Sequence, residues 1–190
     1  MGSRRPFSAV AELESVRHRY MLTQMKAFQI LLLLVSSFHC VAGDLTSKDA
    51  FQAFLNRNDY KSGVAAFERE IATHPADVRL LVGLGQLHYS FEKYGEAKAA
   101  LERALSVEPA HAVAHNYLAI TFAHMEKATE ALKHLDLAIQ SNPNYGDAHF
   151  NRAVILATSS PPNKPAAREA YKRAISLGCD TDISMEELLK

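Results

Sequence analysis

The chain repeats itself every thirty-four residues. The repeat is marked most clearly by prolines at one recurring slot: Pro75, Pro109 and Pro143. A fixed period of this length indicates a supersecondary unit copied along the chain, because one such unit cannot bury its apolar face alone. Neighbouring units must therefore stack and share a core. The period predicts a solenoid.

The slots that the units share fall three or four positions apart, and most are apolar or small. In one unit they are Leu81, Leu84, Gly85 and His88 in the first half, and Ala97, Leu101 and Ala104 in the second half. This spacing places them along one stripe of an α-helix, whereas a strand alternates at every second residue. Proline lacks the amide hydrogen that a helix interior needs, so the proline slot ends the second helix. Each unit is predicted to be a pair of antiparallel helices.

This pattern resembles the tetratricopeptide repeat, which reads W-x2-L-G-x2-Y, then A-x3-F, then P across thirty-four residues. Here the corresponding residues are Leu81-x2-Leu84-Gly85-x2-His88, Ala97-x3-Leu101 and Pro109. The resemblance implies an all-α fold, a right-handed α-solenoid of antiparallel helix hairpins. Residues 44–190 would form this domain, with units at about 44–77, 78–111, 112–145 and 146–181 and a short capping helix at 182–190. The two central units match best.

The flanking units depart from the pattern. In the first, Phe51 stands where the other units have a small residue, and Gly63 stands where they have alanine, so we expect these two to face each other at constant volume. The last unit carries two extra residues, with Pro165 in the first turn of the following helix. Gly178 is the predicted stop of that helix.

The end of the chain is predicted to cover the last repeat. Ser184 and Glu187 have the spacing of a capping box that would start a short helix. Four apolar side chains have the composition to cover the exposed core of the last unit: Ile183, Met185, Leu188 and Leu189.

The amino-terminal segment has the layout of an export signal. Lys26 precedes a mostly apolar run that includes the leucines from Leu31 to Leu34, and small residues lead up to Ala42 and Gly43. Residues 25–43 are therefore predicted to be a signal peptide cleaved near their end, or a membrane anchor formed by residues 27–43. Residues 1–24 are interpreted as an unstructured or mis-assigned extension. We expect an exported protein, periplasmic or in the cell envelope of a bacterium.

Charge and cysteine content exclude several classes of function. The whole chain has 21 basic and 21 acidic residues, and residues after Gly43 have 16 basic and 19 acidic ones. Without a basic field, nucleic acid is not expected as a partner. Only Cys179 remains after cleavage, so the exported domain would have no internal disulfide and would be held by packing.

No motif of catalysis or cofactor binding stands out. Gly83 and Gly85 open like a dinucleotide loop, but His88 takes the place of the third glycine, and helix packing explains both glycines. His111 and His115 have the spacing of two metal ligands on one helix, yet both fit slots of the repeat. We therefore expect neither a metal nor a cofactor, and no enzyme activity.

The resemblance also implies where a partner would bind. In tetratricopeptide proteins the first helix of each unit lines a concave groove that receives an extended or helical peptide. The groove residues predicted to contact a protein or peptide are Arg79, Gln86, Tyr89, Asn116, Ile120, His124 and Phe150. Too few cations are present for a carboxylate clamp. The prediction is a scaffold or adaptor. The alternatives are a structural subunit of an envelope complex or a self-associating solenoid and, less favoured, an enzyme or metal-binding protein.

Overall fold

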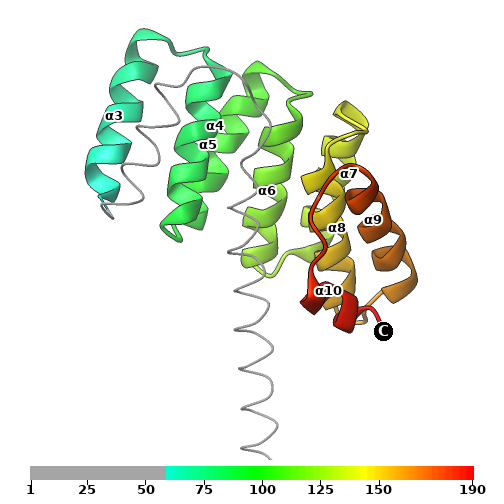
Figure 1. Cartoon of the computed structure of the whole chain (residues 1–190). Coiled ribbons are helices and arrows are strands. Elements are labelled where there is room, and N and C mark those ends of the chain that lie inside the picture. The colour runs from blue at the N-terminus through cyan, green and yellow to red at the C-terminus, as the bar shows by residue number, and fades with distance from the viewer. Residues whose placement is uncertain (1–58) are drawn as a thin grey trace, which may run out of the picture. The chain divides into compact units, whose positions relative to one another are not determined.

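The structure is a computed structural model that describes residues 59–190, and every regular element within them is a helix (Figure 1). In chain order the helices are α3 (Tyr60–Thr73), α4 (Val78–Ser90), α5 (Tyr94–Val107), α6 (Ala112–His124), α7 (Ala128–Ser141), α8 (Gly146–Thr158), α9 (Lys164–Ser176) and α10 (Ile183–Leu188). The predicted export signal, the first helix of the first unit and Phe51 lie outside the described residues. None of the described helices is long and apolar enough to cross a membrane.

The helices form the hairpins that the repeat predicts. α4 packs on α5, α6 on α7 and α8 on α9, and consecutive hairpins also pack on one another. The first helices begin at Val78, Ala112 and Gly146, which reproduces the interval of the prolines. Contacts of α4 with α6 and of α6 with α8 place these first helices side by side in one layer. The second helices form the other layer.

A continuous core runs through the hairpins. The shared slots hold side chains that are almost fully buried, including Leu81, Leu101, Leu118 and Leu135. Burial of such side chains is the main favourable term in folding, at about 25 cal/mol per Å² of apolar surface. Arg152 breaks the pattern because it occupies a leucine slot, and its guanidinium Nε lies 2.9 Å from Asp136 Oδ1 on α7.

The two glycines of α4 allow close helix contacts. A Cβ atom at Gly85 would lie 2.6 Å from Leu101 Cγ, and one at Gly83 would lie 2.6 Å from Phe67 Cε1. Both glycines are inside a helix, where they replace side chains at crossings with α5 and α3. Helix packing accounts for them, as the sequence predicts.

The turns of the α4–α5 and α6–α7 hairpins each contain a residue in the left-handed region. Glu92 has φ 59° and Glu126 has φ 60°, at the same position of two successive units. At the first turn, the Lys93 amide donates to the His88 carbonyl and the Glu92 amide donates to the Tyr89 carbonyl, both at 2.9 Å. This double hydrogen bond is the Schellman ending of a helix, in which glycine is the favoured residue.

Replacing Glu92 or Glu126 with glycine is expected to raise the free energy of unfolding by about 0.5 to 1 kcal/mol. Glycine relieves the clash of Cβ with the following carbonyl, and this gain exceeds the entropy that glycine adds to the unfolded chain. Urea denaturation of each variant measures the change. A matched Glu102→Gly variant inside α5 should be destabilised instead, because that position is regular helix.

The carboxyl-terminal region confirms two predictions and corrects two. Pro165 lies in the first turn of α9, and Gly178 follows this helix with φ 93°. The predicted capping box at Ser184 is wrong, because α10 begins at Ile183 and the Asp182 carboxylate accepts the Met185 amide. A carboxylate directly before the helix caps it as well as a hydroxyl does, so the helix begins earlier.

The apolar side chains predicted to cover the last repeat are buried to different extents. Met185 is fully buried and Leu189 is nearly so, whereas Ile183 is 76% exposed, against expectation. The Tyr171 hydroxyl lies 2.6 Å from the Asp182 amide, and the Arg168 guanidinium donates to the Leu189 carbonyl. These bonds to α9 fix the orientation of α10 and leave Ile183 at the surface.

Candidate functional site

We define the first-helix face as the surface formed by α4, α6 and α8 on the side away from the second helices. The residues that directly precede these three helices differ in whether their side chains cap the helix. Asp77 and His111 cap α4 and α6 by accepting the amides of Arg79 and Ala114. Tyr145 occupies the same slot before α8 but makes no capping bond. Its hydroxyl lies 3.4 Å from Asn116 Nδ2 instead, which brings a phenol onto the face.

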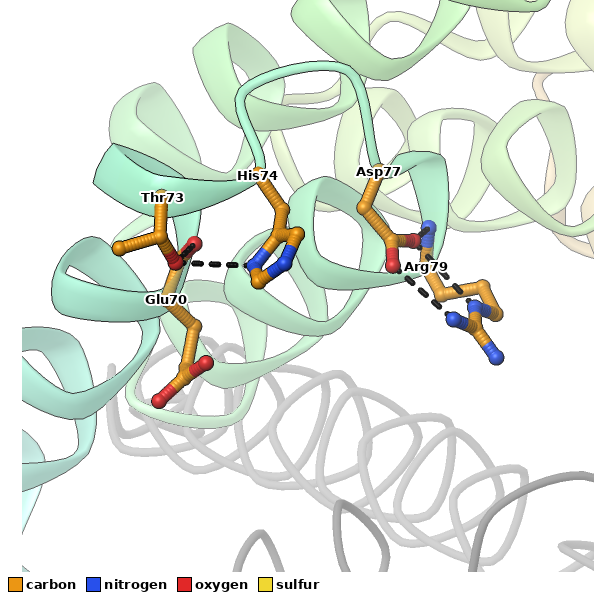
Figure 2. A network of polar contacts seen from close by, with 5 residues as sticks. All are labelled: Glu70, Thr73, His74, Asp77 and Arg79. Carbon is orange, nitrogen blue, oxygen red and sulfur yellow. Dashed lines mark hydrogen bonds and ion pairs between the residues drawn. The ribbon is translucent and has the colours of Figure 1, made fainter.

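Arg79 lies at the loop end of this face. Figure 2 shows its guanidinium against Asp77, with Nη2 3.0 Å from Oδ2 and Nε 3.3 Å from Oδ1. The pair holds the pKa of Asp77 below its ordinary value. In the same loop, His74 Nδ1 lies 2.8 Å from Thr73 Oγ1. The side chain of Arg79 is 71% exposed, so screening by water weakens this ion pair.

The predicted residues Tyr89 and His124 meet between α4 and α6. The Tyr89 hydroxyl lies 2.8 Å from His124 Nε2, and the His124 ring stacks on Tyr94 with centroids 4.8 Å apart. Burial lowers the pKa of His124 to about 4 and raises that of Tyr89. The imidazole is therefore neutral near pH 7 and accepts the tyrosine proton in a hydrogen bond.

A second polar group joins α6 and α8. Asn116 and Asn151 are 4% and 3% exposed, and Asn151 Nδ2 donates to Asn116 Oδ1 at 2.8 Å. In the part of the chain that the structure describes, Asn151 Oδ1 has no hydrogen-bond partner. A buried acceptor without a donor costs about 1 to 3 kcal/mol. The face thus contains an acceptor whose hydrogen-bonding capacity is unused.

Asp147 adds negative charge beside these amides. Burial raises the pKa of its carboxyl. Burial also raises the pKa of Tyr117 and of Tyr145, and the negative charge of Asp147 adds to both shifts. Tyr117 also meets Tyr89 edge to face, with centroids 6.3 Å apart. The face is therefore aromatic around Tyr117, and the Asp147 carboxylate lies at its loop end, in the slot that Arg79 occupies on α4.

The other predicted groove residues are distributed differently. Gln86 is half-buried on α4, Ile120 is 4% exposed, and Phe150 packs against Tyr171 of α9 with centroids 5.9 Å apart. Phe150 is thus part of the packing between α8 and α9. The sequence prediction missed Tyr94, Tyr117, Tyr145 and Asn151. The loss of a capping residue at Tyr145 was the one signal in the sequence that could have found this group.

The histidines considered for a metal have separate structural roles. His111 caps α6, whereas His115 Nε2 donates to the Pro109 carbonyl at 3.0 Å. That bond leaves His115 Nδ1 as the acceptor for His134 Nδ1, 3.0 Å away. Within residues 59–190, no group of three or more histidine, cysteine, aspartate or glutamate residues is placed to hold a metal ion.

Comparison with known proteins agrees with this architecture. A family model described as "Tetratricopeptide repeat" matches residues 48–97, 84–145 and 125–181. Two crystal structures of MamA share the fold with a TM-score of 0.58, at 20% and 21% identity, and the matches cover 73% and 69% of this chain and 77% and 70% of those chains.

A third solved structure is the first such repeat domain of Spaghetti (RPAP3) bound to the HSP90 peptide SRMEEVD. It matches with a TM-score of 0.54 and 21% identity over 58% of this chain and 86% of that chain. A search of curated sequences finds no match. At these identities the likeness concerns the fold, which is a right-handed α-solenoid of helix hairpins, as the sequence predicts.

Proposed function

Because the chain belongs to the tetratricopeptide repeat family, we propose that it is a scaffold or adaptor whose first-helix face binds a segment of a protein partner. The observation that supports this most directly is the group of tyrosine and amide side chains on that face. These side chains join neighbouring first helices to one another, outside the core between the paired helices. Tyrosine is among the residues that contribute most to binding energy at protein interfaces.

The solved relative with the HSP90 peptide shows that this fold can receive a short segment of another protein. The proposal is that this chain likewise binds a segment of a partner, at the tyrosine and amide side chains of the first-helix face. It involves no bond-making chemistry and no nucleic acid. A segment that lies along α4, α6 and α8 can contact several repeats at once, so its affinity would be the sum of modest contacts.

We further propose that the protein is exported, with residues 25–43 as the signal and the repeats acting in the periplasm or envelope. The support is the order of Lys26, the apolar run and the small residues before Asp44. Intact-mass analysis of the protein purified from its native envelope fraction tests this. A mass that begins near Asp44 supports cleavage, and a mass that retains residues 27–43 supports the anchor instead.

The binding proposal is tested by selecting linear peptides from a random library on the full chain. Gln86→Arg places a long charged side chain on α4, one turn from Tyr89 and Val82, and is expected to weaken the selected peptides about tenfold or more. Gln140→Arg makes the same exchange at an exposed position of α7, in the second layer, and is the matched control. Fluorescence anisotropy with labelled peptides measures both affinities.

Peptides that bind the parent and Gln140→Arg equally but lose affinity for Gln86→Arg support the first-helix face. Equal loss in both variants, or loss only in Gln140→Arg, would place binding elsewhere. The variants should unfold at the same urea concentration as the parent, which shows that the fold is intact.

A further inference from the structure

Asp147 is a carboxylate to which the described part of the chain gives no partner. It lies in the first turn of α8, and no hydrogen bond or ion pair within residues 59–190 involves its side chain. A buried or half-buried carboxylate is costly unless it is paired, because burial removes water from its charge. The Asp147 carboxylate would therefore be stabilised by a cation that comes from outside residues 59–190.

Asn151 supplies a second, independent acceptor. It follows Asp147 by four residues on α8, so both side chains lie on one side of the helix. Asn151 is only 3% exposed, and its Oδ1 has no hydrogen-bond partner among the described residues. Its Nδ2 already donates to Asn116, whose own Nδ2 lies against the Tyr145 hydroxyl. Acceptors are thus in excess here, and a donor is missing.

Aromatic rings border these acceptors. Tyr145 directly precedes α8, and its hydroxyl lies 3.4 Å from Asn116 Nδ2, whereas Tyr117 follows Asn116 on α6. In agreement with this placement, the Asp147 charge adds to the burial that raises the pKa of both tyrosines. Tyrosine faces attract ammonium and guanidinium groups, most strongly where water is excluded. The Cys179 thiol near Asp147 adds no positive charge, because burial and the Asp147 charge raise its pKa to about 11.

We propose that Asp147, Asn151, Tyr117 and Tyr145 form a cation pocket that binds a lysine or arginine side chain of the partner segment. The carboxylate pairs with the cation, Asn151 Oδ1 accepts one of its protons, and the two rings cover its apolar stem. This inference rests on the proposed function of the first-helix face and specifies the chemistry of its ligand. An acidic segment would instead meet the carboxylate with like charge.

The peptide selection described above tests the pocket. Peptides selected on the full chain are expected to share a lysine or arginine at one position, and replacing that residue with norleucine should weaken binding about tenfold. The Asp147→Asn variant should bind the selected lysine or arginine peptide more weakly by a similar factor. It should also bind this peptide and the norleucine peptide with equal affinity. Glu130→Gln, which removes an exposed first-turn acid from α7, is the matched control and should change neither affinity.

A charge exchange makes the result independent of folding defects. Asp147→Arg should bind the peptide with glutamate in place of its lysine more tightly than the original peptide. The pocket would be overturned if the selected peptides shared no cation, or if a lysine peptide bound Asp147→Asn as tightly as the unmutated protein. Neither result would contradict binding at the first-helix face. If selection yields no peptide sensitive to Gln86→Arg, the groove itself fails, and the pocket fails with it.

Discussion

Replacing Leu101 with alanine is expected to lower the free energy of unfolding by about 2 to 5 kcal/mol. Leu101 has no exposed surface and lies where α5 crosses α4, so its loss removes apolar burial and leaves a cavity. Urea denaturation followed by circular dichroism measures the change. Leu137→Ala, a half-buried leucine on α7, makes the same exchange with less burial and should cost clearly less.

The effect of Leu101→Ala should depend on Gly85. Gly85→Ala alone is expected to cost about 1 to 3 kcal/mol, because the new Cβ would lie 2.6 Å from Leu101 Cγ. In the double variant the added methyl enters the space left by leucine, so the combined cost should be smaller than the sum. Strict additivity would mean that the two residues do not share this crossing.

Acid should destabilise the fold before carboxylates are protonated. Burial lowers the pKa of four histidines from the ordinary 6.5: His88, His115, His124 and His134. Between 6.5 and each folded pKa, the unfolded chain binds more protons than the folded chain, so stability falls as pH falls. Between pH 7 and pH 5 the free energy of unfolding should therefore decrease, with His124, whose folded pKa is about 4, contributing on the order of 1 to 2 kcal/mol of this decrease.

Variants of single histidines identify the source of this pH dependence. His124→Gln should flatten it most, because the folded pKa of His124 is about 4 and its neutral ring accepts the Tyr89 proton. His74→Gln removes an exposed histidine between α3 and α4 and serves as the control. Asp147 works in the opposite direction, since its raised pKa makes the folded state bind a proton first. A pH dependence that is unchanged in His124→Gln would contradict this account.

The period and the prolines were sufficient to predict the helix hairpins, because both depend on backbone geometry. Helices α4, α6 and α8 begin where the thirty-four-residue interval puts them. The glycines of α4 were also explained in advance, since a small residue at a shared slot indicates a close crossing. The start of α10 was mispredicted, because Asp182 and Ser184 are both good capping residues and sequence spacing alone does not rank them.

The candidate site was only partly predictable. A helical wheel assigned Tyr89, Asn116 and His124 to the first-helix face, and the structure shows the polar contacts that each makes there. Phe150 was also assigned to this face, but its ring packs on Tyr171 of α9 within the same hairpin. The roles of Asn151 and Tyr145 depend on hydrogen bonds between neighbouring repeats. The residue pattern of a single helix does not show such contacts.

The most direct test of the account is amide hydrogen exchange on the full chain with and without a selected peptide that carries the shared cation. If the first-helix face binds the peptide, added protection should appear in α4, α6 and α8, strongest near Asp147, and α5 and α7 should be unchanged. Added protection in α5 and α7, with α4, α6 and α8 unaffected, would contradict the account.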